Sequence, residues 1–354
     1  MEYRYLGRSG LRVSTLALGT FTFGGKGPFG MLASQGVPEA RALVDLAADH
    51  GVNFIDTANM YSWGVAEEIL GEAIEGRRES LVVSTKARMP VGEGPNDAGA
   101  SRLHLLRECE KSLRRLRTDY IDVYHLHEWD GTTPVEETCE AMDTLVRHGK
   151  VRYWGFSNLC GWQAMKMIHA GDRRGTMRPV TQQIHYTLEA RDAEYELLPL
   201  SVDQGIGVTV WSPLAAGLLT GKHRRGHLTP EGSRQAKGWT EPPIRDVERL
   251  YDIVEVLVEV AEGRGVPPAQ VALAWLLGRP AVASLIVGAR SPDQLRETLP
   301  AAELKLFEEE RARLDEVSRP PLIYPHWHQN QFAKPTFGEA DWALHRGQPE
   351  AAWG

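Results

Sequence analysis

The sequence predicts a single α/β domain closed as a (β/α)8 barrel of the TIM type. Short apolar runs rich in β-branched residues alternate along the chain with longer segments of helical period. The apolar runs lack polar alternation, which is typical of parallel strands that are buried on both faces. Because no linker rich in Gly, Pro or Ser divides the chain, we treat residues 1–354 as one domain rather than two.

The strands and helices follow from these patterns in chain order. We expect eight strands at Leu16–Gly19, Asn53–Asp56, Leu81–Thr85, Ile121–His127, Val151–Phe156, Val180–Ile184, Gly207–Trp211 and Ser284–Val287. The helices between them are expected at Pro38–His50, Glu67–Ile74, Leu103–Leu116, Val135–Arg147, Trp162–Ala170, Tyr195–Gln204 and Asp246–Glu262, with another beginning at Ser291. Eight such units favour a closed barrel over an open doubly wound sheet.

Both ends of the chain lie outside the eight units. Tyr3–Leu6 and Leu11–Val13 flank Gly7–Gly10, so residues 1–15 predict a hairpin that caps one end of the barrel. Residues 320–354 carry Pro, His and Trp with little periodicity, and we expect an irregular C-terminal tail on the surface. Long loops, where barrels place functional residues, are expected at Arg88–Ala100 and Leu214–Arg245.

The composition is that of a globular protein that acts on a small molecule. The 40 Lys and Arg residues against 47 Asp and Glu give a formal charge of −7, which argues against nucleic acid or a membrane surface as partner. Cys109, Cys139 and Cys160 are too widely spaced for a disulfide framework or a structural zinc site. With neither a signal peptide nor a long apolar run, a cytoplasmic location is expected. The sequence is compatible with a homo-oligomer but does not predict one.

Four polar residues lie where expected strands end, and active sites of such barrels form there. Asp56 ends the second strand, Tyr61 follows in its loop, Lys86 closes the third strand and His127 closes the fourth. Each alone also fits a structural role, such as a helix cap or a core imidazole. Together, however, an ammonium and an imidazole can make a phenol, with its ordinary pKa of about 10, a usable proton donor.

The segment DTANMYSWGVAEEILGEAI, which begins at Asp56, resembles the D-T-A-x-x-Y-G-x-x-E-x-x-L-G signature of the aldo-keto reductase family. The similarity continues through HLHEWD, GKVRYWGFSN, Gln183 with Tyr186, VWSPLAAGLLTGK and IVGARSPDQLRE, to about Leu299. LLTGK, GSRQAKG and GARSPDQLRE are similar to the potassium channel beta-subunit-like and related bacterial reductases. Ser62 stands where glycine is usual, Thr298 where asparagine is frequent, and the tail beyond Tyr324 has no match.

The resemblance implies reduction of an aldehyde or ketone by NADPH. Tyr61 would donate the proton, His127 would orient the carbonyl, and Lys86 paired with Asp56 would lower the phenol pKa. The residues expected to bind NADPH or NADP+ are Ser157, Asn158, Gln183, Trp211, Ser212, Leu214, Gly217, Lys222, Arg234, Gly288, Arg290, Gln294 and Glu297. Because Arg234, Arg290 and Lys222 converge on the 2′-phosphate position, NADPH should be preferred over NADH.

The substrate pocket is expected to be lined by Phe21, Trp63, Trp129 and the tail near Tyr324–Trp327. These aromatic residues indicate a carbonyl compound with apolar or sugar-ring surface. Within the same family, a protein that senses NADPH with little turnover, of the channel beta-subunit type, is the alternative to an enzyme.

Two other interpretations, a dinucleotide-binding loop and a metal site, have less support in the sequence. GKGPFG, residues 25–30, has the glycine spacing of a dinucleotide fingerprint, but no strand ends directly before it and no helix begins before Pro38. His125 and His127 lie on one strand face, yet further metal ligands are missing, so His125 is expected inside the barrel. His326 and His328 in the tail are likewise not expected to form a metal site.

Overall fold

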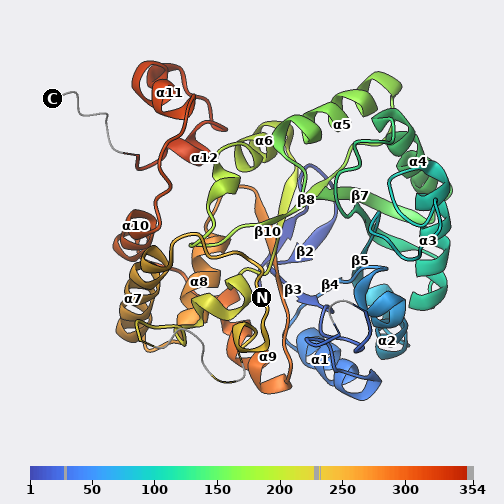
Figure 1. The fold of residues 1–354 in the computed structure, drawn as a ribbon, viewed down its shortest axis with the longest axis horizontal. Helices are drawn as coiled ribbons and strands as arrows, with labels where there is room; N and C mark the ends of the chain where they lie inside the picture. The colour runs from blue at the N-terminus through green and yellow to red at the C-terminus, as the bar shows by residue number, and fades with distance from the viewer. Residues whose placement is uncertain (28–29, 227–230, 232, 349–354) are drawn as a thin grey trace.

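The computed structural model describes residues 1–27, 30–226, 231 and 233–348, and its centre is a closed barrel of eight parallel strands ringed by helices (Figure 1). The strands are β3 (Leu16–Gly19), β4 (Phe54–Asp56), β5 (Val82–Ala87), β6 (Ile121–Leu126), β7 (Val151–Ser157), β8 (Thr181–His185), β9 (Gly207–Trp211) and β10 (Val282–Val287). They pair in sequence order, and β10 closes the ring by pairing with both β9 and β3. The predicted fold class is confirmed.

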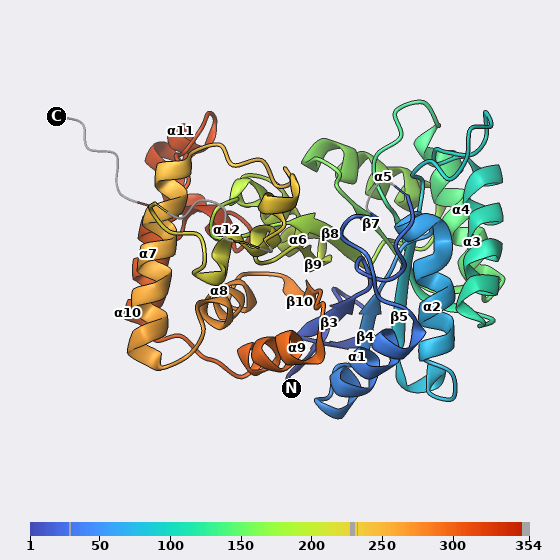
Figure 2. The same cartoon turned by 60° about the horizontal axis from the view of Figure 1, so that its bottom comes forward.

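Helices cover the outside of the barrel. They are α1 (Val37–Asp49), α2 (Val65–Ala73), α3 (Arg102–Leu116), α4 (Val135–Arg147), α5 (Gly161–Arg174), α6 (Leu197–Gln204), α7 (Val247–Arg264), α8 (Pro268–Leu277), α9 (Pro292–Thr298) and α10 (Glu308–Val317). The last helix of the ring, α9, packs beside the first, α1 (Figure 2). Short 3-10 helices are η1 (Tyr61–Gly64), η2 (Arg78–Ser80), η3 (Asp192–Glu194), η4 (Ala215–Thr220), η5 (Gln235–Lys237), η6 (Leu299–Ala302) and η7 (Lys334–Thr336).

Helix α8 was not expected from the sequence, and its burial explains why. Every residue from Ala269 to Leu277 is buried. A helix that is apolar all round has no polar stripe, so its sequence shows no helical period. By contrast, α9 begins as expected, because Ser291 caps it by accepting a hydrogen bond from the backbone N–H of Gln294 at 3.3 Å.

The N-terminal hairpin closes the bottom of the barrel, as expected. Strand β1 (Tyr3–Tyr5) pairs antiparallel with β2 (Arg12–Ser14), and the connecting turn packs against the starts of β8 and β9. Gly7 has a φ of +61°, and a Cβ there would lie 2.3 Å from the carbonyl oxygen of Val180, so only glycine fits. Leu6 and Val13 pack with Phe54 and other residues inside the barrel.

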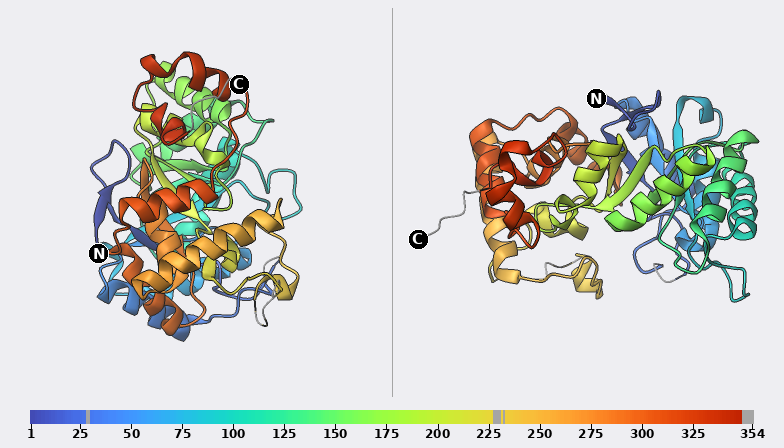
Figure 3. Two further views of the ribbon diagram at one scale, coloured as in Figure 1. Left: turned by 90° about the vertical axis from the view of Figure 1, so that its left-hand side faces the viewer. Right: turned by 90° about the horizontal axis from the view of Figure 1, so that it is seen from above.

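The C-terminal segment is more ordered than the expected irregular tail. Residues 320–348 contain α11 (His326–Phe332) and α12 (Trp342–His345), and α12 packs beside α6 (Figure 3). Ala343 and Leu344 are buried in this contact region. Helices of seven and four residues are too short to show a clear helical period, so the sequence did not predict them. In the described ranges, no helix is both long and apolar enough to cross a membrane.

Candidate active site

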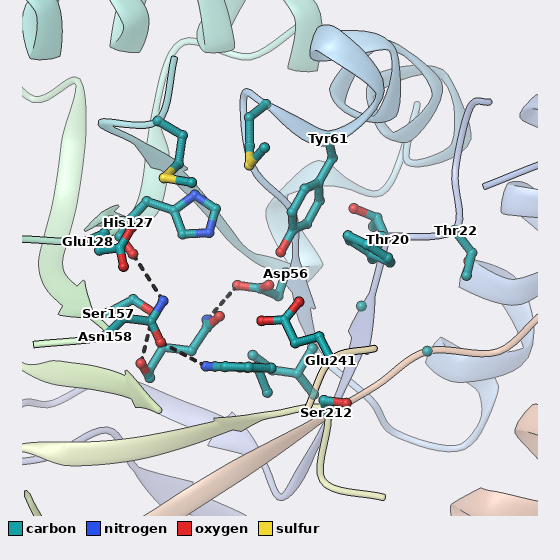
Figure 4. A pocket seen from close by; sticks show the side chains of 18 of the residues that line it. Thr20, Thr22, Asp56, Tyr61, His127, Glu128, Ser157, Asn158, Ser212 and Glu241 are labelled. Atoms are coloured by element: carbon teal, nitrogen blue, oxygen red, sulfur yellow. Dashed lines mark hydrogen bonds between the residues drawn. The ribbon is translucent and has the colours of Figure 1, made fainter. Parts of the chain in front are cut away.

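The four predicted catalytic residues meet at the C-terminal end of the barrel. Asp56 is the last residue of β4, Tyr61 begins η1 in the loop that follows, and His127 comes directly after β6. These three line a pocket of about 280 Å³ (Figure 4). Lys86, inside β5, is completely buried beside Asp56. The topology therefore brings together residues that are up to 71 positions apart.

An ion pair between Asp56 and Lys86 forms the base of the pocket. Lys86 Nζ donates to Asp56 Oδ2 at 2.6 Å and to the carbonyl oxygen of Thr57 at 2.7 Å. The other carboxylate oxygen, Oδ1, accepts from Ser84 Oγ at 2.8 Å and from Gln183 Nε2 at 2.9 Å. Burial lowers the pKa of Lys86, and the Asp56 carboxylate partly offsets this effect. Three neighbouring groups, from Thr57, Ser84 and Gln183, thus hold the pair in place.

Tyr61 lies over this ion pair, between two other rings. Its ring centre is 5.2 Å from Lys86 Nζ, 6.2 Å from the His127 ring and 5.3 Å from the Phe21 ring. The expectation that Lys86 lowers the phenol pKa is not met, because burial raises the pKa of Tyr61 and the charges of Asp56 and Glu241 raise it further. Tyr61 is protonated at neutral pH, as a phenol of ordinary pKa also is, and this is the state that a proton donor requires.

The two histidines of this region are both kept neutral. Burial and the nearby Lys86 charge lower the pKa of His125 to about 3, and the same causes lower the pKa of His127 well below its ordinary range. His125 lies inside the barrel, where its Nδ1 is 3.2 Å from Ser84 Oγ, as expected. Among the described residues, no cluster of His, Cys, Asp or Glu could hold a metal ion.

Ser157, Asn158, Gln183 and Trp211 also line the pocket, and they are linked to one another. Ser157 Oγ donates to the carbonyl oxygen of Gln183 at 2.8 Å, while Asn158 Oδ1 accepts from Trp211 Nε1 at 3.0 Å. Asn158 has a φ of +56° and donates through Nδ2 to the carbonyl oxygen of His127 at 3.3 Å. This network fixes an amide and an indole ring at the mouth of the barrel.

A second groove of about 420 Å³ continues from the pocket. The two share five lining residues, namely Thr22, Ser212, Arg234, Ile286 and Gly288. All the remaining predicted cofactor residues line the groove: Leu214, Gly217, Lys222, Arg290, Gln294 and Glu297. Pocket and groove together make one continuous trough across the barrel mouth.

The lining of the groove includes two arginines and a glycine with open space beside it. Partial burial lowers the pKa of Arg234, and the charge of Arg290 lowers it further, so the two guanidinium groups lie within electrostatic reach of each other. Gly217 lines the same groove, and a Cβ there would meet nothing within 4 Å. Gln294 Oε1 accepts from the backbone N–H of Arg290 at 2.9 Å, which holds Arg290 at the start of α9.

The aromatic residues expected around the substrate are only partly in the pocket. Phe21 lines it and packs against Trp239 at 6.1 Å, but Trp63 and Trp129 are not among its described lining residues. Trp129 packs instead on Trp162 at 5.6 Å. Tyr324 lines a different cavity, beside α6. Contrary to the expectation, none of the described residues of the tail lines the catalytic pocket.

Several pocket residues were missed in the sequence: Thr20, Thr22, Met60, Met89, Glu128, Trp239 and Glu241. Glu128 directly follows His127 and could have been found from that position. Trp239 and Glu241 belong to the long loop after β9, and only the length of that loop pointed to them.

Ser62, the departure from the family pattern, connects two loops of the site. Its Oγ donates to the carbonyl oxygen of Phe23 at 2.9 Å and accepts from the backbone N–H of Gly25 at 3.1 Å. Ser62 has a φ of +50°, a region that favours glycine. The two hydrogen bonds offset this strain and fix the loop that carries Tyr61. Phe29, in the fingerprint-like segment 25–30, and its neighbour Pro28 lie outside the described residues.

The mouth of this (β/α)8 barrel has the features of a reductase-type site: a buried Lys–Asp pair, a tyrosine beside it, and a continuous trough. The profile of the aldo/keto reductase family matches residues 15–319. The chain therefore belongs to the aldo/keto reductase family, and it is an oxidoreductase.

Similar proteins come from bacteria, plants and yeast. The uncharacterized oxidoreductase YrpG of Bacillus subtilis (strain 168) is 41% identical over 328 residues, which cover 90% of this chain and 96% of YrpG. A probable voltage-gated potassium channel subunit beta of Arabidopsis thaliana is 39% identical over 310 residues, covering 86% and 92% of the two chains. A putative subunit of the same kind from Schizosaccharomyces pombe is 36% identical, covering 90% and 93%.

Proposed function

We propose that this protein reduces an aldehyde or ketone to the alcohol with NADPH as hydride donor. The observation that carries the proposal is the position of Tyr61, which lines the pocket with its ring centre 6.2 Å from the His127 ring and 5.2 Å from Nζ of Lys86, the buried partner of Asp56. The family to which the chain belongs typically uses a nicotinamide cofactor.

The trough fits such a cofactor in shape and charge. Trp211 offers a ring face in the pocket, and Asn158 beside it offers an amide that can bind a carboxamide. In the groove, Arg234 and Arg290 suit a phosphate, because two guanidinium groups held near each other gain from an anion between them. When bound, the cofactor would supply the hydride.

The side chains of the pocket supply binding and proton transfer. Tyr61 donates its hydroxyl proton to the carbonyl oxygen as that oxygen gains negative charge. The imidazole of His127 is neutral, so it can orient the carbonyl by a hydrogen bond without acting as a stronger competing acid. The Lys86 ammonium, 5.2 Å from the Tyr61 ring, stabilises the phenolate left after the proton transfer.

Steady-state oxidation of NADPH against a panel of aldehydes and ketones tests this proposal. Tyr61→Phe should lower kcat roughly 10²–10⁴-fold, as expected for loss of a general acid, while the Kd for NADPH stays close to wild type. A Tyr61→Phe variant with near-normal kcat would refute the role of Tyr61.

A second candidate function is a binding protein that senses NADPH with little turnover. The similarity to proteins named as potassium channel beta subunits favours it. The same assay separates the two functions, because a sensor binds NADPH tightly yet oxidises it at a negligible steady-state rate with every carbonyl compound.

A further inference from the structure

Two carboxylates face the reacting end of the pocket from different loops. Glu128 follows His127 in the loop after β6, and Glu241 belongs to the long loop after β9. Both line the pocket together with Tyr61, and Figure 4 shows Glu128 beside His127 and Glu241 below the Tyr61 hydroxyl. Neither side chain forms an ion pair with a described residue.

The other charges of the pocket do not neutralise these carboxylates. Asp56 is balanced by Lys86 at 2.6 Å. Arg234 is the one cation among the described lining residues of the pocket, and it lies where the pocket meets the groove, within electrostatic reach of Arg290. The reacting end therefore has an excess of negative charge.

Electrostatic effects within the pocket agree with this arrangement. Desolvation of the part of Glu241 that faces the pocket raises its pKa, although the residue as a whole is exposed, and the charge of Glu128 raises it further. The charge of Glu241 also acts on Tyr61. The two carboxylates thus repel each other across the space that a substrate would enter, and a positive group placed there would relieve the repulsion.

We propose that Glu128 and Glu241 select the substrate by charge, favouring cationic and neutral carbonyl compounds and rejecting those that carry a carboxylate or phosphate. This inference rests on the proposed function, because it names the class of substrate reduced at the same site. Repulsion of an anionic competitor is a common source of specificity. Glu241 is exposed and Glu128 only partly buried, so solvent screening limits the effect.

The test compares three benzaldehydes that differ at the para position. One carries a carboxylate, one a trimethylammonium group, and one a tert-butyl group, which has the shape of trimethylammonium without its charge. The substituents also change the reactivity of the carbonyl, so the deciding comparison is between variant and wild type on the same aldehyde. We expect the double variant Glu128→Gln/Glu241→Gln to lower the cation-to-anion ratio of kcat/KM about tenfold, mainly through KM. The matched control is Glu93→Gln, an exposed glutamate of the Arg88–Ala100 loop outside the pocket lining, which should leave the ratio unchanged.

An unchanged ratio in the double variant would overturn the inference, and so would a wild-type protein whose KM is lower for the carboxylate than for the trimethylammonium compound. If no aldehyde is turned over, the proposed function fails, and the charge selection is then measured by binding alone. Quenching of tryptophan fluorescence, with Trp211 and Trp239 in the pocket, reports binding of the same aldehydes. Tighter binding of the cation, lost in the double variant, would support the inference, and equal binding would overturn it.

Discussion

Replacing Asp56 by Asn removes the charge that neutralises Lys86 but keeps the shape of the side chain. Asp56 is 2% exposed and Lys86 is 0% exposed, so the ammonium would be left in the interior without a counter-charge. In Asn the negative charge is gone and one carboxylate oxygen becomes an amide nitrogen, which cannot accept a hydrogen bond. Either Lys86, which donates to Oδ2 at 2.6 Å, or Ser84 and Gln183, which donate to Oδ1, therefore lose their acceptor. Breaking such a buried pair costs about 3–5 kcal/mol, and we expect a loss of stability in this range.

The double variant Asp56→Asn/Lys86→Met separates the charge effect from the loss of packing. Because it removes both charges, it should recover a large part of the stability lost in Asp56→Asn, so that the coupling free energy of the pair is about 2 kcal/mol or more. The matched control is Asp293→Asn, which breaks an exposed ion pair with Arg296 and should change stability by less than about 0.5 kcal/mol.

Urea unfolding followed by circular dichroism measures five proteins: the wild type, the single variants Asp56→Asn and Lys86→Met, their double variant, and the control. Without Asp56, the pKa of Lys86 in the folded protein falls further, and the unfolded chain then binds more protons than the folded one up to about pH 10. Stability therefore rises with pH more steeply in Asp56→Asn than in wild type, so the deficit should be smaller at about pH 9 than at about pH 7. An Asp56→Asn variant that loses less than 1 kcal/mol, or a double variant that loses the sum of the single losses, would refute this reasoning.

Three further predictions concern the cofactor, the C-terminal helices and the buried histidine. Arg290→Ala should weaken NADPH binding about tenfold and barely change NADH binding, because one charge-assisted contact to phosphate is worth about 1.5–3 kcal/mol; equal loss in a fluorescence titration of both cofactors would show that Arg290 does not recognise the 2′-phosphate. Removal of the chain from Gln329 onward should lower the free energy of unfolding in urea by about 2–3 kcal/mol, because Ala343 and Leu344 are buried. It should leave KM unchanged, because neither residue lines the catalytic pocket, and a raised KM would contradict this. The pKa of His125 is lowered to about 3, so below about pH 6.5 the unfolded chain binds a proton that the folded chain does not. Stability therefore falls as the pH drops, by up to about 1.4 kcal/mol per pH unit. His125→Gln should make this dependence of stability on pH less steep, and an unchanged slope would contradict the prediction.

The strands of the barrel could be predicted well, because a strand that is buried on both faces consists of a short run of apolar residues that is visible in the sequence. All eight expected strands are present, with ends that differ by one or two residues at most positions. The expected strand Leu81–Thr85, for example, is Val82–Ala87 in the structure, which places Lys86 inside it. The failures were elements whose apolar pattern has no period, such as α8, or whose length is too short to show one, such as α12.

The candidate site divides in the same way. Tyr61 and Lys86 follow strand ends within recognisable motifs, so their meeting at the barrel mouth follows from the topology. The positions of Trp239 and Glu241 depend on the path of a long loop, which no local pattern specifies. The sign of the pKa shift of Tyr61 could not be predicted either, because it depends on how completely the ring is buried.

The hairpin that seals the barrel also sets an order on folding. Its residues precede their partners by a long stretch of chain: the backbone N–H of Arg8 donates to the carbonyl oxygen of Gly205 at 2.7 Å, and the Arg4 side chain donates to those of Leu277 and Val282 at 2.8 Å. Until those residues leave the ribosome, Leu6 and Val13 have no interior to enter. Contacts of such long sequence separation form slowly, so the hairpin docks late although it precedes its partners in the chain.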